Sequence, residues 1–365
     1  MARKLFIAAT GQNSGKTTTS LSLMYMARKK YKRVGFIKPI GPKPSEFNGI
    51  EADKDAIVMA RVYGLEADLA LMSPFVLKPG DTRKFLDGEI SSDLIRQKIR
   101  CAIEILEEKN DFLIIEGAGH SGVGSVVGFG NAQIAREFDA PVLMVAGGGL
   151  GDVIDSMHLN LALFEKFQVS VRALLANKII PEKRDRNLRY LNQAFADLSI
   201  KVIGGFNYQP ILANPTLRRV STVLNVPLCS ATDDEAQRIA HHIQIGAAST
   251  QRVTELLGDS SLVVVNRSRD ELLVTLANLY QIAEYKEKIA GLVIPGIGEV
   301  SRITQTILDR SGIPYIRVHR STSEVFATLS EDVSKITAED THKISLIQEL
   351  ADFRFDFDTI DGLLD

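Results

Sequence analysis

Residues 4–19 read KLFIAATGQNSGKTTT, and this stretch decides the fold. The apolar run at its start predicts a buried strand, and the glycine-rich turn leads into a predicted helix at residues 16–30. In such a turn, backbone N–H groups point inward and the helix N-terminus adds a positive dipole, which suits phosphate groups. The usual pattern has its first glycine where this chain has Thr10, and Gly11 follows one residue later. The strand, turn and helix context still predicts nucleotide binding.

Each part of this loop has an expected task. Lys16 should reach the β- and γ-phosphates and neutralise charge during phosphoryl transfer, and the Thr17 hydroxyl should ligate Mg²⁺. The alternative is an ordinary glycine turn in which the letters GKT are accidental. The residues expected to contact the nucleotide are Gly11, Gln12, Asn13, Ser14, Gly15, Lys16, Thr17 and Thr18.

Short apolar runs alternate with amphipathic stretches up to about residue 207. Because the runs are apolar on both faces, they predict buried parallel strands wrapped by helices, an α/β fold. The runs lie at residues 33–40, 112–119, 141–148, 171–178 and 201–207.

Two acidic residues near strand ends are candidate metal ligands. Glu116 ends the strand FLIIE, and Asp55 lies at the start of a predicted helix. The carboxyl edge of a parallel sheet is where ligands bind, and Mg²⁺ on a nucleotide takes one or two carboxylates besides the phosphates. We therefore predict a metal site of Thr17, Asp55 and Glu116. The alternatives are a solvated strand end for Glu116 and helix capping for Asp53 and Asp55.

Lys38 and Asn177 end two further strands, so we expect them at the same edge. Lys38 ends the strand in FIKPIG and would position an anionic substrate as a second catalytic lysine; the alternative is a plain surface lysine. Asn177 would pair with adenine through the donor and acceptor of its amide, unless it only forms a turn.

The glycine-rich segment after Glu116 matches the pattern G-x-G-x-x-G at residues 117–122. A dinucleotide site would require that turn to open a helix directly, whereas glycines continue to Gly130 before helical periodicity resumes. We therefore expect a long loop over the phosphates and no nicotinamide or flavin. The residues of this loop expected near the substrate are Gly117, Ala118, Gly119 and His120.

Two prolines within residues 208–215 end the periodic pattern and predict a domain junction. The predicted domains are residues 1–212, a second α/β unit at 216–335, and a helical tail at 336–365. Within the second unit the expected strands are 261–266, 290–296 and 314–318, and the expected helices are 217–224, 234–241, 270–283, 299–310 and 321–329.

Composition narrows the function classes. With 365 residues, 45% hydrophobic and 24% charged, the chain is of ordinary globular make-up, and a net charge of -2 disfavours nucleic acid and anionic membrane as partners. Its two cysteines and six histidines show no metal-ligand spacing. No signal peptide or membrane-spanning run is apparent, so we expect a cytoplasmic protein.

The ordered motifs GQNSGKTTT, FIKPIG, DKDA, LIIEGAG and LLANK resemble the dethiobiotin synthetase family over residues 1–210. The resemblance implies a P-loop NTPase sheet that binds ATP, with Mg²⁺ at the positions matching Thr17, Asp55 and Glu116. It also implies a substrate-facing Lys38 and an adenine-reading Asn177. That family phosphorylates a substrate carbamate and closes a ring, usually as a homodimer. Because His120 and Ser121 depart from its pattern, biotin chemistry itself is not implied.

Residues 73–88 and the second unit are similar to the N-terminal regulatory region of long bacterial phosphate acetyltransferases, where a DRTGG domain follows a dethiobiotin-synthetase-like domain. The namesake residues are poorly kept, since the corresponding segments read NRSRD at 266–270 and PGIG at 295–298. The acetyltransferase catalytic domain has no counterpart before Asp365, so this chain alone is not expected to transfer acetyl groups.

Two main hypotheses follow. The first is an ATP- and Mg²⁺-dependent enzyme that phosphorylates a carboxylate or carbamate of an anionic small molecule. The second is a nucleotide-sensing regulatory module, in which the second unit reads the state of the glycine loop. A scaffold with an inactive site is the remaining alternative.

Overall fold

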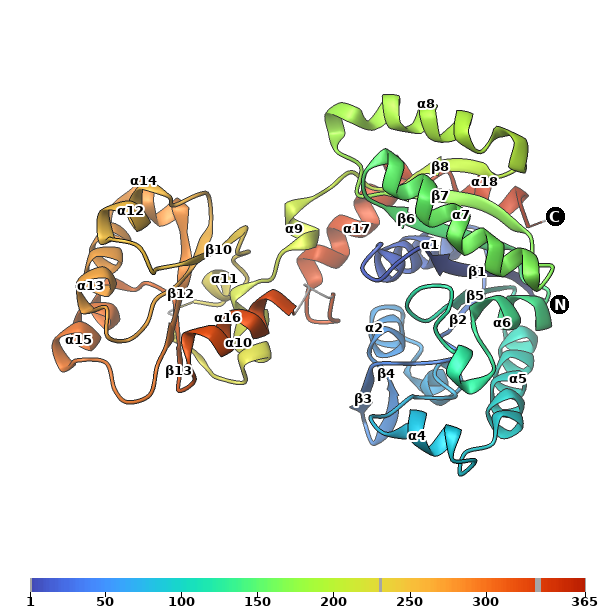
Figure 1. Cartoon of the computed structure of the whole chain (residues 1–365), viewed down its shortest axis with the longest axis horizontal. Helices are drawn as coiled ribbons and strands as arrows, with labels where there is room; N and C mark the ends of the chain where they lie inside the picture. Colours follow the sequence, from blue (N-terminus) through green and yellow to red (C-terminus); the bar gives the residue numbers. More distant parts are fainter. Residues whose placement is uncertain (1, 230–231, 332–335, 365) are drawn as a thin grey trace. The chain divides into compact units, whose positions relative to one another are not determined.

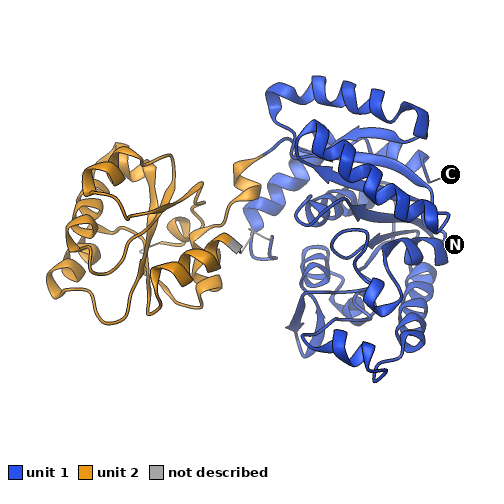
Figure 2. Ribbon diagram, in the orientation of Figure 1, with its two compact units in different colours: residues 1–208, 336–365 blue, residues 209–335 orange. Residues whose placement is uncertain are grey.

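The structure is a computed structural model that describes the chain except for residues 1, 230–231, 332–335 and 365 (Figure 1). The chain divides into two compact units, which Figure 2 colours separately. The first unit contains residues 1–208 together with 336–365, and the second contains residues 209–335. The C-terminal segment that we expected to form a helical tail therefore belongs to the first compact unit.

The first unit is built on a six-stranded parallel sheet in the order β2-β5-β1-β6-β7-β8. Its central strand, β1, pairs with β5 on one side and with β6 on the other. The strand order therefore reverses beside the loop of residues 10–15 that follows β1, which we call the phosphate loop. The strands are β1 Arg3–Ala9, β2 Val34–Ile37, β5 Phe112–Glu116, β6 Val142–Gly147, β7 Val171–Asn177 and β8 Lys201–Gly204.

Helices cover both faces of this sheet (Figure 1). On one face, alternate strand residues pack with apolar side chains of α5, α6, α7 and α8 in a single buried core. The helices are α1 Lys16–Lys30, α2 Lys54–Tyr63, α3 Leu69–Met72, α4 Asp81–Leu86, α5 Ser92–Lys109, α6 Asn131–Glu137, α7 Leu150–Lys166, α8 Arg184–Ala194, α17 Thr341–Arg354 and α18 Phe357–Gly362. Short 3-10 turns lie at Glu66–Asp68, Ser125–Val127, Pro181–Lys183 and Ala196–Leu198.

The C-terminal helices α17 and α18 pack beside α1 on the other face. The ring centroid of Phe357 lies 5.8 Å from that of Phe112 on β5, and the ring of Phe355 meets that of Phe206 edge-on at 4.9 Å. These aromatic contacts complete the apolar cover of the sheet.

A two-stranded antiparallel hairpin, β3 Pro44–Phe47 and β4 Ile50–Asp53, connects β2 to α2. The sequence analysis did not predict this hairpin, because its strands read PSEF and IEAD and contain no continuous apolar run. The hairpin matters for the site, since β4 ends at Asp53 immediately before α2.

The second unit holds a five-stranded sheet in the order β10-β11-β12-β13-β9, in which β9 runs antiparallel to β13. Its strands are β9 Leu228–Cys229, β10 His242–Ile245, β11 Ser261–Val264, β12 Ile289–Pro295 and β13 Tyr315–Val318. Its helices are α9 Pro210–Ala213, α10 Leu217–Leu224, α11 Asp233–Ala236, α12 Thr250–Glu255, α13 Asp270–Leu279, α14 Ala283–Lys288, α15 Arg302–Ser311 and α16 Thr322–Glu331.

The predicted fold class is confirmed, because a parallel sheet flanked by helices is accompanied by a second, smaller α/β unit. One predicted helix was wrong. The helix expected at residues 234–241 ends at Ala236, and the chain continues into the parallel strand β10, whose backbone groups form hydrogen bonds with β11. Within the described residues, no helix is both long and apolar enough to span a membrane.

Candidate functional site

The loop between β1 and α1 is held in shape by its own side chains and by β7. The hydroxyl of Ser14 donates to the carbonyl of Gly11 at 3.1 Å, and the amide of Asn177 donates to the carbonyl of Ser14 at 3.0 Å. Gly15 has a φ of +100°, a conformation that favours glycine. The exposed side chains of Gln12 and Asn13 lie at the outer part of the loop.

Lys16 begins α1 and is 9% exposed. Its ammonium donates a hydrogen bond to the carbonyl of Gly119 in the glycine-rich loop. Burial lowers the pKa of Lys16 to about 8, and the nearby positive charge of Lys38 acts in the same direction. The ammonium that a phosphate would bind is therefore partly desolvated and held by one backbone oxygen. Thr17 and Thr18 follow on α1 and are half-buried.

Lys38, Asp55 and Glu116 meet in the interior beside α1. The ammonium of Lys38 donates to Asp55 Oδ2 at 2.7 Å and to Glu116 Oε1 at 2.6 Å, and the hydroxyl of Ser20 donates to Glu116 Oε2 at 2.6 Å. Lys38 is 1% exposed and Glu116 is fully buried. Neither Lys38 nor Glu116 is thus the surface residue that the alternatives described.

Charge pairing keeps this cluster ionised. Burial alone would lower the pKa of Lys38, but the carboxylates of Asp55 and Glu116 outweigh it and hold the pKa above its usual value. Burial would likewise raise the pKa of Asp55, yet Lys38 and Lys43 hold it well below its usual value. A buried ammonium between two carboxylates is stable only because all three side chains are paired.

Asp53 has a separate, structural task. Its side chain accepts hydrogen bonds from the backbone N–H of Asp55 at 2.8 Å and of Lys43 at 2.9 Å, so it caps α2 and fixes the β3–β4 hairpin. The capping interpretation therefore applies to Asp53. Asp55 instead turns its carboxylate to Lys38 and to Lys43, at 2.7 and 3.0 Å.

Two asparagine side chains position the loops of the site. Asn177 accepts from the backbone N–H of Phe206 at 3.1 Å besides donating to Ser14, so its amide is engaged at both ends. Asn131, buried at the start of α6, donates to the carbonyls of Ala118 and His120 and accepts from the N–H of Ala118. It thereby fixes the segment that follows Glu116.

The glycine-rich loop is a loop in the structure, with α6 beginning only at Asn131. Gly117 and Ala118 are buried, Gly119 contacts Lys16, and His120 is exposed, with its Nδ1 accepting from the N–H of Gly122 at 3.2 Å. The buried hydroxyl of Ser121 has no hydrogen-bond partner among the described residues.

Sequence reasoning missed Ser20, Lys43 and Asn131. Ser20 lies one helical turn after Lys16, so helical spacing could have placed it beside the loop. Lys43 and Asn131 contact the site through a hairpin and a long loop, and no local pattern signals either contact. The predicted residues Lys16, Lys38, Asp55 and Glu116 do converge at the carboxyl edge.

The donor set fits Mg²⁺, which prefers hard oxygen ligands and keeps several waters. Two buried carboxylates, Asp55 and Glu116, already share one cation, the ammonium of Lys38. Among the described residues, no group of three or more His, Cys, Asp or Glu side chains could hold a metal. The cluster thus suits a metal that brings phosphate oxygens with it and does not suit an all-protein cage.

A family model described as an AAA domain matches residues 3–216. The phosphate acetyltransferase of Synechocystis is 22% identical over 299 residues, covering 80% of this chain and 42% of that protein. That of Haemophilus influenzae is 21% identical and covers 100% of this chain and 53% of its own length. The chain therefore spans about half of the phosphate acetyltransferases that it matches, or less.

The ATP-dependent dethiobiotin synthetase of Methanocaldococcus jannaschii is 29% identical over 179 residues, covering 48% of this chain and 79% of that protein. The predicted resemblance to both groups of proteins is confirmed. Among solved structures, the CBS and DRTGG domains of Clostridium perfringens pyrophosphatase align over 44% of this chain at 12% identity. Their TM-score of 0.27 is too low to establish a common fold.

Proposed function

The chain belongs to the family described as an AAA domain and is a P-loop nucleotide-binding protein; from this premise we propose that it uses Mg-ATP to phosphorylate a carboxylate or carbamate of a small molecule. The single observation that carries the proposal is the buried convergence of Lys38, Asp55 and Glu116 beside the phosphate loop. A loop that only recognises phosphate would not need two buried carboxylates around a second lysine.

The phosphate loop binds and orients the nucleotide. Backbone N–H groups of residues 11–18 would hold the phosphates. Lys16 would exchange the Gly119 carbonyl for phosphate oxygens, and these anionic partners would neutralise its charge. Asn177 braces the loop, because its amide donates a hydrogen bond to the Ser14 carbonyl. For base recognition we propose that adenine pairs with the second N–H and the second oxygen lone pair of the Asn177 amide, beside its bonds to Ser14 and Phe206.

Mg²⁺ would be held by Thr17, Asp55 and Glu116 and would supply Lewis-acid stabilisation of the phosphoryl oxygens. Ser20 orients the Glu116 carboxylate through its 2.6 Å hydrogen bond. Lys38 would position the acceptor, because an acceptor carboxylate is the same kind of anionic oxygen as the two that Lys38 already binds. The segment 117–120, fixed by Asn131, would exclude water from the transferring group.

The test is phosphate release from Mg-ATP in the presence of a panel of dicarboxylates and amino-acid carbamates. We expect one acceptor class to accelerate release, and Lys16→Ala to reduce the accelerated rate by on the order of 100-fold or more. Lys183→Ala, which changes an exposed lysine of the same unit, is the matched control. Acceleration that persists in Lys16→Ala, or an equal loss in Lys183→Ala, would contradict the proposal.

A nucleotide-sensing role is the second candidate, and the contact between Lys16 and Gly119 favours it. A bound phosphate would compete with the Gly119 carbonyl for the ammonium, so nucleotide occupancy would be coupled to the conformation of the glycine-rich loop. Tight Mg-ATP binding with a change in hydrogen exchange at residues 117–124, but with no acceptor-stimulated release, would support this candidate over the enzyme.

A further inference from the structure

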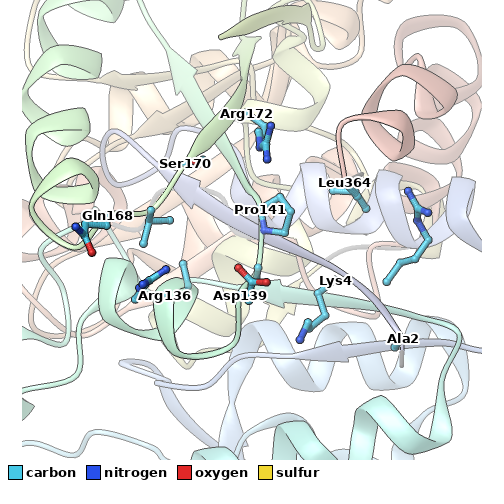
Figure 3. Close-up of a pocket in the computed structure, with 13 residues that line it drawn as sticks. Ala2, Lys4, Arg136, Asp139, Pro141, Gln168, Ser170, Arg172 and Leu364 are labelled. Atoms are coloured by element: carbon cyan, nitrogen blue, oxygen red, sulfur yellow. The ribbon is translucent and has the colours of Figure 1, made fainter. Parts of the chain in front are cut away.

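We propose that a pocket at the amino edge of the first unit's sheet binds a small oxyanion that carries at least two negative charges. The pocket has a volume of about 370 Å³ and lies where β1, β6 and β7 begin (Figure 3). A volume of this size is within the range of small-molecule sites. The lining side chains used below are Arg3, Lys4, Arg136, Asp139, Gln168, Ser170 and Arg172.

Basic side chains from three elements converge on this pocket. Arg3 and Lys4 come from the start of β1, Arg136 from the end of α6, and Arg172 from the start of β7. Figure 3 shows Arg136, Asp139 and Arg172 arranged around Pro141. Because the strands are parallel and adjacent, their amino ends present these cations to one space.

The four cations differ in whether their charge is already neutralised. Arg3 pairs with Asp361 at 3.1 Å, and Lys4 pairs with Glu107 at 2.9 Å. Arg136 and Arg172 are exposed, and within the described part of the chain neither forms an ion pair or a side-chain hydrogen bond. Their guanidinium groups therefore supply two unneutralised charges with donors suited to bidentate oxyanion binding.

Two neutral donors complete the pocket. The amide of Gln168 and the hydroxyl of Ser170 are exposed, and their side chains have no hydrogen-bond partner among the described residues. Asp139 lines the same pocket, so the positive charge of Arg136 and Arg172 is reduced but not cancelled. An anion with two or more charges would be attracted by both arginines and repelled by one carboxylate, so its net electrostatic interaction with these three side chains would be favourable.

This site is separate from the phosphate loop. β1 begins at the pocket with Arg3 and ends with Ala9, directly before that loop. Seven residues of strand separate the two ends by roughly 20 Å. A ligand in the pocket would therefore bind independently of Lys16, and the two sites can be tested apart.

The test titrates the full chain with inorganic pyrophosphate and, in a second arm, with citrate, to tell phosphate from carboxylate ligands. The background is Lys16→Ala, which weakens binding at the phosphate loop. We expect at least one probe to bind, with an affinity that falls on the order of 100-fold in Arg136→Ala/Arg172→Ala. Asp139→Asn should instead strengthen binding several-fold, because it removes the opposing charge.

Arg83→Ala/Arg186→Ala is the matched control, since these exposed arginines of the same unit also lack a side-chain partner in the described structure and lie outside the pocket. Hydrogen exchange should show protection at residues 139–140 and 168–171 when the probe is bound. The proposal is wrong if neither probe binds in the Lys16→Ala background, if the pocket variant keeps its affinity, or if the control pair loses as much.

Discussion

Gly15 shows how closely the phosphate loop is fitted to its neighbours. Its φ of +100° is strained for any residue with a side chain, and a Cβ at this position would lie 2.1 Å from Nδ2 of Asn177. That same Asn177 nitrogen holds the Ser14 carbonyl. The glycine is therefore required by backbone conformation and by space at once.

We expect Gly15→Ala to lower the free energy of unfolding by about 2 kcal/mol or more without any nucleotide, because it adds strain and displaces Asn177. Gly11→Ala is the matched change, since a Cβ there would meet no atom closer than Ser14 Oγ at 3.7 Å. It should cost less than about 1 kcal/mol. Urea unfolding measures both, and similar losses in the two variants would refute the close-approach explanation.

Lys38 balances two buried carboxylates, which gives it a stabilising role as well as the proposed functional one. Lys38→Met should lower the free energy of unfolding by about 3–5 kcal/mol, because it leaves Asp55 and Glu116 without their shared cation. Lys43→Met is the comparison, since the Lys43 ammonium binds one carboxylate among the described residues, that of Asp55, and its side chain is 31% exposed. Its loss should stay near 1 kcal/mol or below, as for partly exposed pairs. An effect of Lys38→Met no larger than that of Lys43→Met would contradict the buried-cluster account.

At the scale of elements, α1 links the site to the C-terminal helices. Its first turns carry Lys16 and Ser20, and its last turn carries Lys30, which pairs with Asp358 and Asp361 of α18. Asp361 also accepts from the hydroxyl of Tyr31 at 2.8 Å and pairs with Arg3. Asp361 is thus the main polar anchor of α18.

The anchoring by Asp361 should depend on pH. Burial would raise its pKa, but the hydrogen bonds from Lys30 and Tyr31 and the charge of Arg3 hold the pKa below its usual value. A carboxyl whose pKa is lower in the folded state binds fewer protons there than in the unfolded chain. Its contribution to stability is complete above the unfolded pKa of about 4 and is lost as the pH falls through the folded pKa.

We therefore expect Asp361→Asn to lower the free energy of unfolding by about 1–3 kcal/mol at neutral pH. Its difference from wild type should shrink below about pH 4. Asp358→Asn, which removes a carboxylate from the same helix and the same Lys30, is the control because its side chain is 86% exposed. It should cost at most about 1 kcal/mol. A difference for Asp361→Asn that does not change with pH would show that ionisation is not the cause.

For the whole molecule, the sequence predicted what periodicity and local motifs encode. The runs ending at Glu116 and Asn177 are continuous and apolar, so the parallel strands of the first unit could be recognised. The polar hairpin β3–β4 and the short strand β10 lack such a pattern, and neither was predicted. Nor could any local pattern show that residues 336–365 return to the first unit, because that depends on contacts across the whole chain.

The candidate site was predictable in part for the same reason. Strand ends placed Lys38 and Glu116 at one edge, since parallel strands share that edge. Side-chain distances cannot be read from a sequence, so the pairing of Lys38 with both carboxylates and the bracing of residues 118–120 by Asn131 emerged only from the structure. Roles in catalysis and in metal binding stay predictions.

Removing residues 336–365 should destabilise the first unit by several kcal/mol, because α17 and α18 bury apolar side chains worth about 1.5–3 kcal/mol each. Ile347, Phe357 and Ile360 are almost completely buried. The matched variant replaces residues 209–335 by a flexible linker and keeps both helices. Its free energy of unfolding should therefore lie within about 1 kcal/mol of that of the first unit in the full chain. Equal stabilities of the two variants would contradict this assignment of the C-terminal helices.

The central claim is that the loop beginning α1 and the cluster around Lys38 form one Mg-nucleotide site. Calorimetric titration with Mg-ATP tests it most directly, in wild type, Lys16→Ala, Glu116→Gln and the control Lys183→Ala. We predict saturable binding in wild type and in the control, a large loss in Lys16→Ala, and in Glu116→Gln retained nucleotide binding with a weaker dependence on Mg²⁺. Absence of binding in wild type, or unchanged titrations in both site variants, would contradict the account.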